Sequence, residues 1–525
     1  MNQAEVICTL LIVVATLAIL ATKVALPYPV LLVLGGLVLG FVPGLPAVQL
    51  DPDMVFLFLL PPLLYPAALF TSWRDFRANM GSISMLAIGL VLLTTATVAA
   101  VVHALTGLPW PAAFVLGAII SPTDSVAATA ITSRLRVPQR IVAILDGESL
   151  VNDATALVAY RFAIVAMTSG RFSFSEASGR FVLVALGGIG IGLAVGWLAS
   201  QVQRRLDDPP VQILISLLTP FAAYIPAERW HVSGVLAVVA SGLFLGWRSP
   251  VILTYRTRLN GLVFWEMMVF LLNGLLFVLI GLQLPRILHA LSGQSLRQLI
   301  WHGVLISSAA IVVRIAWVFA ATGLLHLISI SLGKRDPFPA WQNLAIIAWT
   351  GMRGVLSLAA ALALPLTLSD GRAFPGRDYI LFITFCVILA TLVLQGLSLP
   401  TLIRRLGVVD DGLANLEERT ARLKANEAAI AYLAEVESRY PSDLVERLRV
   451  EYDDRIRQLE VCANSDGDHS HGLITPSYQS LQQEALFVER RTIIQLRNEY
   501  VINDEVLRRI QNDLDHAEAR LRVPE

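Results

Sequence analysis

One apolar stretch, residues 141–167, limits what this chain can fold into. IVAILDGESLVNDATALVAYRFAIVAM is long enough to cross a bilayer as a helix, yet its middle carries Glu148, Ser149, Asn152 and Asp153. Residues three and four apart share a helix face, so Ser149 lies beside Asp153 and Glu148 beside Asn152. A carboxylate at mid-membrane depth costs roughly 2.5–3.5 kcal/mol or more. Two of them, beside an amide and a hydroxyl, predict a site that handles a cation or a proton.

The composition predicts a membrane protein with a soluble tail. Hydrophobic residues make up 55% of the 525 residues and charged residues 15%, and most of the charged residues lie after about residue 408. The formal net charge is 0, and we expect no nucleic-acid partner. The three cysteines are far apart, without CxxC spacing, so neither a disulfide framework nor a metal cluster is indicated.

About twenty apolar residues cross a bilayer, and on that basis we predict an all-α polytopic protein. The domains expected are a transmembrane domain over residues 1–407 and a cytoplasmic helical tail over 408–525. The first apolar run has no basic residue before it, so we interpret it as a retained span and not as a cleaved signal. Thirteen spans are predicted near residues 4–22, 28–43, 53–71, 81–106, 110–132, 140–168, 180–202, 209–226, 232–247, 257–284, 298–330, 338–366 and 377–403.

The distribution of basic residues predicts the orientation. An odd number of spans places the termini on opposite sides, and cytoplasmic loops carry an excess of Lys and Arg. Loops on the side of the C-terminus hold about fifteen basic residues and those on the other side about seven. We therefore expect the N-terminus outside and the tail in the cytoplasm.

The tail is expected to be a small helical module. Residues 417–440 are predicted to be helical, a second helix is expected to start at Pro441-Ser442-Asp443, and a third is expected from about 477 to 521. His469 and His471 lie in a polar loop between them, a pattern more typical of a solvated loop than of a metal site.

Two predicted spans are interrupted at matching positions. SPTD, residues 121–124, breaks the fifth span, and TGMRG, residues 350–354, breaks the twelfth. Each is the fifth span of its half if the chain is a six-plus-six inverted repeat, and paired interruptions of this kind indicate a transport site. Pro122 frees backbone carbonyls, while the Thr123 hydroxyl and the Asp124 carboxylate add oxygen ligands.

Asp153 is the first candidate for binding the transported ion. A carboxylate removed from water holds a proton more tightly, and a nearby positive charge opposes this effect, so proton and cation can compete for the same oxygens. Oxygen ligands from Asp153, Ser149 and Thr123 suit Na⁺ or Li⁺ better than a soft metal.

Several charges accompany this candidate site. Glu148 and the amide oxygen of Asn152 are the expected partners of Arg353, whose guanidinium is too costly to leave unpaired in a membrane. Internal ion pairs that fix the packing are the simplest interpretation of Arg314 and Glu266. Asp146 and Arg161 are interpreted as side chains that reach the ends of the central helix.

Five motifs together resemble the monovalent cation:proton antiporter-1 family, the bacterial relatives of the animal sodium/proton exchangers. They are SPTDSVA, GESLVNDATALV, WTGMRGVLSLAAALALP, LLPPLLY at residues 59–65 and VLQGLSLP at residues 393–400. The resemblance implies a homodimer in a bacterial inner membrane, with a dimerisation part at about 1–72 and 209–285. It also implies a mobile core at about 80–168 and 298–405, and an elevator-like, electroneutral exchange.

The resemblance also assigns roles to individual residues. The cation- or proton-binding positions carry over to Asp153, Asp124, Ser149 and Thr123, and the supporting network to Asn152, Glu148 and Arg353. The sequence departs from the family pattern at one position that bears on the affinity for the cation and on the choice between Na⁺ and K⁺. Some members place an acidic residue just after the PPLLF-type motif, where this chain has Pro66.

The sequence therefore predicts exchange of Na⁺ or Li⁺ for H⁺, with no cofactor and no enzymatic activity. K⁺/H⁺ exchange is the alternative within the same class, and a cation channel or an ion sensor is the alternative outside it. An intramembrane protease using Asp124 and Asp153 would carry a GxGD motif, which this sequence lacks.

Overall fold

The computed structural model forms two compact units, Met1–Asp410 and Asp411–Glu525, and each is described by itself. Regular structure in the described part is helical, apart from one isolated bridge between Thr367 and Ala373. The residues described are 3–24, 27–42, 55–132, 135, 137–169, 174–291, 295–333, 338–368, 372–408, 412–464 and scattered positions between 487 and 517.

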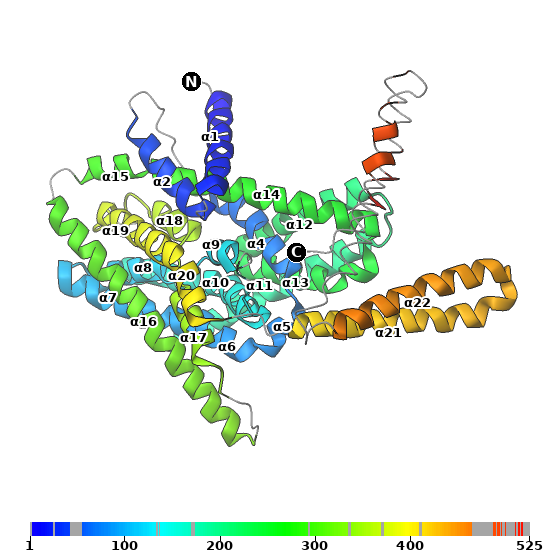
Figure 1. The fold of residues 1–525 in the computed structure, drawn as a ribbon. Helices are drawn as coiled ribbons and strands as arrows, with labels where there is room; N and C mark the ends of the chain where they lie inside the picture. Colours follow the sequence, from blue (N-terminus) through cyan, green and yellow to red (C-terminus); the bar gives the residue numbers. More distant parts are fainter. Residues whose placement is uncertain are drawn as a thin grey trace. The chain divides into compact units, whose positions relative to one another are not determined.

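The first unit contains the helices from α1 to α20, which are labelled in Figure 1. Its first half contains α1 (Gln3–Val24), α2 (Tyr28–Gly40), η1 (Val55–Leu59), α4 (Leu60–Phe70), α5 (Trp73–Ala78), α6 (Met80–Ser84), η2 (Met85–Leu90), α7 (Val91–Thr106), α8 (Trp110–Ile120), α9 (Ser125–Thr132) and α10 (Gln139–Ser169). Its second half contains α11 (Phe174–Gln203), α12 (Pro209–Arg229), α13 (Gly234–Ile252), α14 (Tyr255–Leu282), α15 (Leu284–Ala290), α16 (Leu296–Ser331), α17 (Trp341–Trp349), α18 (Val355–Leu362), α19 (Arg377–Ala390), η4 (Thr391–Gln395) and α20 (Gly396–Leu406).

The prediction of an all-α membrane protein is confirmed. Among the described residues, eight helices are long and apolar enough to cross a membrane, and shorter apolar helices accompany them. Each of the thirteen predicted segments contains helix, but the number of spans itself stays a prediction. The segment predicted at 232–247 is longer than expected, since α13 continues through Pro250 to Ile252.

Both predicted interruptions are present. The fifth segment consists of α8 and α9 with non-helical residues 121–124 between them, and the twelfth consists of α17 and α18 with non-helical residues 350–354 between them. Pro122 cannot donate a helical hydrogen bond and disfavours helix at the residue before it, which explains the first break. Gly351 and Gly354 lie in the second break. Glycine disfavours helix there, because it loses more backbone entropy than alanine when it becomes helical.

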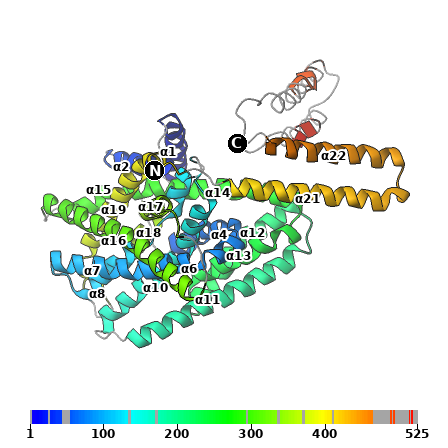
Figure 2. The ribbon, with the colours of Figure 1, turned by 60° about the horizontal axis from the view of Figure 1, so that its bottom comes forward.

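The helices of the first unit pack in two groups, and in Figures 1 and 2 α12 and α13 of one group lie apart from α7 and α8 of the other. In what we call the scaffold group, α13 packs on α4, α11 and α12, and α14 packs on α2. In what we call the core group, α8 packs on α7 and α10, and α16 packs on α7, α17 and α19. The two groups meet where α10 contacts α4 and α13, and where α14 contacts α18. The broken helices therefore lie at the boundary between the groups.

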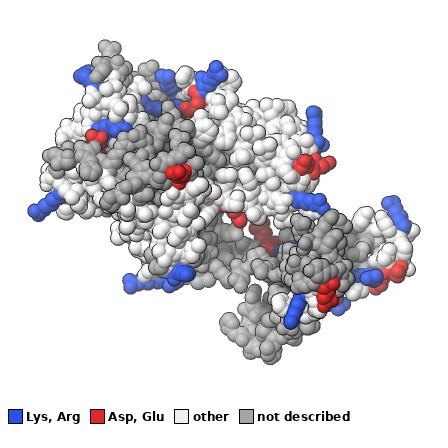
Figure 3. All heavy atoms as spheres, turned by 90° about the horizontal axis from the view of Figure 1, so that it is seen from above, with Lys and Arg blue, Asp and Glu red and all other residues white. Residues whose placement is uncertain are grey.

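The outer surface of the first unit is apolar over long helices. On α11, α14 and α16, the side chains of Leu183, Val263 and Leu327 are each more than 60% exposed. The described surface in Figure 3 is mostly uncharged, with Lys, Arg, Asp and Glu in small scattered groups. Apolar surface of this extent is typical of a protein that contacts lipid.

The second unit contains a helical hairpin. α21 (Leu413–Val436) continues into the short η5 (Glu437–Arg439), and α22 (Ser442–Asn464) returns along it. The second tail helix begins at Ser442, directly after Pro441, as predicted. Most of the predicted third helix, together with His469 and His471, lies outside the described residues.

Close packing of α2 on α14 depends on two glycines. A Cβ atom at Gly36 would collide with the backbone carbonyl of Val278, and one at Gly281 would collide with backbone atoms of Val33 and Leu37. Small residues at such crossings let helix backbones approach within a membrane, where dispersion contacts replace the hydrophobic effect between helices. These two helices are therefore fixed to each other by shape.

We expect Gly281→Ala to destabilise the protein, because the new methyl group meets backbone that cannot move away. Overpacking of this kind costs about 1–3 kcal/mol, which would lower the thermal unfolding midpoint measured in detergent. Gly323→Ala on α16 is the matched control, since a Cβ there meets nothing within 4 Å. Equal midpoints for the two variants would contradict this account of the crossing.

Candidate functional site

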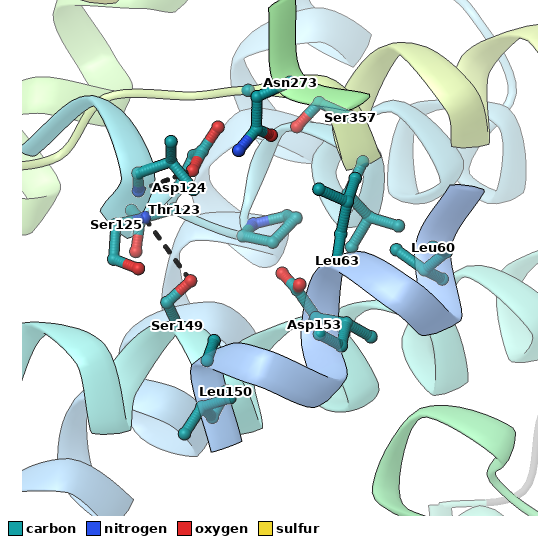
Figure 4. Close-up of a pocket in the computed structure, with 16 residues that line it drawn as sticks. Leu60, Leu63, Thr123, Asp124, Ser125, Ser149, Leu150, Asp153, Asn273 and Ser357 are labelled. Atoms are coloured by element: carbon teal, nitrogen blue, oxygen red, sulfur yellow. Dashed lines mark hydrogen bonds between the residues drawn. The ribbon is translucent and has the colours of Figure 1, made fainter. Parts of the chain in front are cut away.

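A small pocket of about 80 Å³ lies at the boundary between the two groups of helices. Its walls come from α4 and α14 of the scaffold group, and from residues 122–126, α10 and α18 of the core group. Figure 4 shows polar side chains facing this space from opposite sides, among apolar residues such as Leu60 and Leu63. The polar residues that line it are Thr123, Asp124, Ser125, Ser149, Asp153, Asn273 and Ser357.

Asp153 stands on the α10 wall of the pocket and points into it (Figure 4). Its side chain is 8% exposed, and no hydrogen bond to its carboxylate is found within the described part of the chain. Ser149 lies one turn earlier on the same face, and its Oγ accepts a hydrogen bond of 3.4 Å from the backbone N–H of Ser125. Asp153 is thus a buried carboxylate whose negative charge is open to a ligand.

Asp124 connects the two broken helices. Its Oδ1 accepts a hydrogen bond of 2.8 Å from the N–H of Val126, which caps the start of α9, and its own N–H donates to the carbonyl of Met352 at 2.9 Å. A Cβ atom at Gly354 would collide with the Asp124 carboxylate, so a larger residue there cannot be accommodated without displacing Asp124. Glycine in the second break therefore makes room for the acid of the first.

Thr123, Glu148 and Asn152 form a hydrogen-bonded network behind the pocket. The Thr123 hydroxyl donates to Glu148 Oε1 at 2.9 Å and accepts from Asn152 Nδ2 at 2.8 Å. Asn152 Nδ2 also approaches the Thr123 carbonyl at 3.3 Å. Thr123 was predicted as a cation ligand, and the structure shows that its hydroxyl already serves this network.

Arg314 of α16 is the partner of Glu148. Its Nη1 and Nη2 donate to the two carboxylate oxygens at 2.5 and 2.9 Å, and both side chains are at most 2% exposed. The same guanidinium donates through Nε and Nη2 to the Ile347 carbonyl near the end of α17, at 3.3 and 3.1 Å. The prediction that Arg314 forms an internal ion pair is confirmed, and this fork-shaped pair anchors the network.

The predicted partners of Arg353 are wrong. Its Nη1 donates to the carbonyl of Ser121 at 3.0 Å, and its backbone N–H donates to the Thr391 hydroxyl at 3.1 Å. Arg353 is directed to the C-terminal end of α8, where helix carbonyls lack partners. Glu148 is taken by Arg314, which reaches it from a helix that the sequence alone does not place nearby. The amide oxygen of Asn152 has no hydrogen-bond partner among the described residues.

The other intramembrane charges lie away from the pocket. Arg161 Nη2 is 2.6 Å from Glu228 Oε2, an ion pair between α10 and α12 with both side chains partly exposed. Glu266 is exposed and has no ion-pair partner in the part of α14 and its surroundings that the structure describes, so its predicted internal pair is wrong. Asp146 is the exception: its side chain makes a hydrogen bond with Ser125, which lines the pocket, and so does not reach the end of α10 as predicted.

Sequence reasoning missed three polar residues of the pocket: Ser125, which directly follows Asp124, Asn273 on α14 and Ser357 on α18. Asn273 and Ser357 are each a single polar residue in an apolar run, without a neighbouring proline or acid to mark them. The sequence signal for Asn273 and Ser357 is only a lone amide or hydroxyl in an apolar segment, because such a group needs a hydrogen-bond partner once it is buried.

The arrangement suits a small hard cation or a proton. Carboxylate and hydroxyl oxygens line the pocket, and such ligands favour alkali and alkaline-earth ions over soft metals. Within the described residues no group of three His, Cys, Asp or Glu side chains that could hold a metal ion is found. A cation in this pocket would be bound by the Asp153 carboxylate and by neutral oxygens of the lining residues.

Comparison of the sequence with known families and proteins gives three results. A family model described as "Sodium/hydrogen exchanger, transmembrane" matches residues 9–405. An uncharacterized Na⁺/H⁺ exchanger of Mycobacterium tuberculosis is 37% identical over 529 residues, 99% of this chain and 96% of the relative. A sodium, potassium, lithium and rubidium/H⁺ antiporter of Bacillus pumilus is 36% identical over 391 residues, 72% of this chain and 58% of the relative.

A solved structure shares the fold. The sodium proton antiporter MjNhaP1 from Methanocaldococcus jannaschii superposes with a TM-score of 0.60 and 21% sequence identity, over 77% of this chain and 99% of that one. The helical arrangement of the first unit is thus that of an antiporter of known structure.

We expect Glu148→Gln and Arg314→Met to destabilise the protein strongly as single changes, because each leaves a buried charge without its partner. Breaking a buried pair costs about 3–5 kcal/mol. The double variant should lose less than the sum of the two, measured as thermal unfolding midpoints in detergent. Glu418→Gln is the control, since its pair with Arg422 is 58–62% exposed. Additive losses would show that the two residues do not act as a pair.

Proposed function

This chain belongs to the sodium/hydrogen exchanger family, and we propose that it exchanges Na⁺ for H⁺ at the pocket around Asp153. The observation that carries the proposal is the buried Asp153 carboxylate, which faces the pocket without a hydrogen bond in the described part of the chain. A bare carboxylate is costly at this depth. Binding either Na⁺ or H⁺ removes that cost, and competition between the two couples their movements.

The charges around the pocket support an electroneutral, one-for-one exchange. Glu148 and Arg314 cancel as an ion pair, and the charges of Asp124 and Arg353, which lie in the two breaks, also sum to zero. Among the charges of the lining residues and of the network behind them, one negative charge then remains, on Asp153. A single Na⁺ or a single H⁺ neutralises it, so the site carries the same charge with either cargo.

The position of the pocket supports an elevator-like alternating access. Asp124, Ser149 and Asp153 belong to the core group, at about residues 80–168 and 298–405, whereas α4 and α14 belong to the scaffold group. Movement of the core group past the scaffold group would carry Asp153 from one side of the membrane to the other. The neutralised site can make this movement, because the bare carboxylate is held back by its desolvation cost.

The proposed setting is a bacterial cell membrane, with the N-terminus outside and the tail in the cytoplasm. The basic residues of the loops support this orientation. We place a homodimer interface on the scaffold group, at about residues 1–72 and 209–285. The α11 helix goes with this group, because it packs on α12 and α13.

K⁺/H⁺ exchange is the second candidate function. In the favoured function, Na⁺/H⁺ exchange, Li⁺ is a further cation that could be transported. The wall contributed by α4 is apolar, formed by Leu60, Leu63, Leu64 and Ala67, and Pro66 is buried where some relatives carry an acid. A site with fewer carboxylates attracts a small, strongly hydrated ion less. The potassium in the name of the Bacillus pumilus relative supports the same alternative.

We expect Asp153→Asn to abolish cation-driven proton flux, because the amide can neither release a proton nor balance a cation. The assay is the internal pH of sealed proteoliposomes, followed with a dye, after addition of Na⁺, Li⁺ or K⁺ outside. Asp207→Asn is the matched control, since Asp207 is exposed in the loop before α12.

The wild-type protein should raise the internal pH on addition of Na⁺, and Asp207→Asn should do the same. If Asp153→Asn retained the response, the site would have to lie elsewhere. A wild type without any cation response would exclude exchange and leave the channel or sensor alternatives. A larger response to K⁺ than to Na⁺ would favour the second candidate.

We also expect the initial rate of exchange to be independent of membrane potential. A K⁺ gradient with valinomycin sets the membrane potential in the same proteoliposomes. The anion on both sides is one that does not carry protons across the membrane, and Na⁺ then starts the exchange. A one-for-one carrier moves no net charge, so the rate should remain within experimental scatter from negative to positive potentials. A rate that rises steeply with potential would contradict the charge count given above.

A further inference from the structure

Asn273 is an unexplained polar residue in the middle of α14. Its side chain is 2% exposed, and its Nδ2 has no hydrogen-bond partner among the described residues. Its neighbours Leu272 and Gly274 are apolar or small, and Gly274 packs against Val14. A buried amide NH2 group without a partner has lost its hydrogen bonds to water without replacement, and no described residue around α14 replaces them.

The Asn273 side chain faces the pocket. It lines the cavity from the scaffold side, and Figure 4 shows it with Ser357 on the wall opposite Asp153 and Ser149. The Ser357 hydroxyl is also buried and also lacks a hydrogen-bond partner in the described part of the chain. Two unsatisfied polar groups therefore converge on one small space.

We propose that Asn273 is a ligand of the transported cation and sets its affinity and selectivity, with Ser357 beside it. This inference rests on the proposed function, because the cation is the cargo bound at Asp153. The Asn273 amide is a ligand when it turns about its last side-chain torsion, so that the carbonyl oxygen and not Nδ2 faces the pocket, and Ser357 adds a hydroxyl oxygen. A cation in the pocket then has a carboxylate and a hydroxyl on the α10 wall, and these two oxygens on the other.

The scaffold group offers no alternative ligand at this position. The α4 residues that line the pocket are three leucines and an alanine, so Asn273 is the polar lining residue that this group supplies among those described. A neutral ligand adds binding energy without adding charge. The Asn273 oxygen therefore strengthens cation binding, and Asp153 alone still determines the net charge of the site when a cation is bound.

The test compares two substitutions of similar size, Asn273→Leu and Asn273→Asp. Leucine fills the space without an oxygen, and aspartate keeps an oxygen at the same position. Asn260→Leu is the matched control, because Asn260 is an exposed asparagine on the same helix. For each variant, the proteoliposome assay gives the cation concentration at half-maximal rate and the maximal rate, at alkaline pH.

We expect Asn273→Leu to raise the half-maximal Na⁺ concentration about tenfold, the equivalent of about 1.4 kcal/mol, with a maximal rate within about twofold of the wild type. Asn273→Asp should bind Na⁺ as well as the wild type or better, and Asn260→Leu should be unchanged. A packing role predicts the reverse order, since leucine is tolerated in an apolar wall better than aspartate. Asn273→Leu with an unchanged half-maximal concentration would overturn the proposal.

Cation binding without transport provides a second measurement. Na⁺ or Li⁺ should raise the thermal unfolding midpoint of the wild type in detergent, because a ligand that binds the folded state stabilises it. Asn273→Leu should need about ten times more cation for the same rise. This measurement separates the two proposals. A wild type that Na⁺ stabilises but that does not exchange Na⁺ would contradict only the proposed function. Equal stabilisation of Asn273→Leu and the wild type by Na⁺ would contradict only the role of Asn273.

Discussion

The buried pair of Glu148 and Arg314 is the interaction on which the arrangement of the site depends. Its two hydrogen bonds satisfy both carboxylate oxygens, and the remaining donors of Arg314 reach the end of α17. Glu148 in turn holds the Thr123 hydroxyl, which receives the Asn152 amide. One ion pair thus connects α16, α10 and both broken helices. Its desolvation cost is tolerable only because nearly every polar atom in it has a partner.

Two arginines perform equivalent tasks at the two breaks. Arg353, which lies in the second break, donates to the carbonyl of Ser121 at the end of α8, and Arg314 donates to the carbonyl of Ile347 near the end of α17. A helix that stops inside a membrane leaves carbonyls without partners. A guanidinium satisfies them and also complements the negative end of the helix. The crossing of the broken helices is therefore stabilised at the C-terminal end of each first half, while Asp124 caps the start of α9.

This use of charge accounts for the chemistry of the pocket. Glu148, Arg314, Arg353 and Asp124 all have structural partners, whereas the carboxylate of Asp153 has none among the residues that the structure describes. In the proposed function, one uncompensated charge would select one monovalent cargo at a time, and that property would follow from the supporting residues as much as from Asp153. The pocket also lies between two separately packed groups of helices, so a movement between them would change the surroundings of Asp153 without breaking the network behind it.

The sequence by itself determined the class of fold, both helix breaks and most of the candidate site. Glu148, Ser149, Asn152 and Asp153 lie on one helix, where spacing alone fixes which residues are neighbours, and Pro122 marks a break by its missing N–H. Only the tertiary structure decided the contacts between distant helices: Arg314 with Glu148, Arg353 with Ser121, and Asn273 beside the pocket. Periodicity describes one helix at a time, whereas these contacts depend on how rigid helices pack, which small residues such as Gly354 and Gly281 control by allowing close approach.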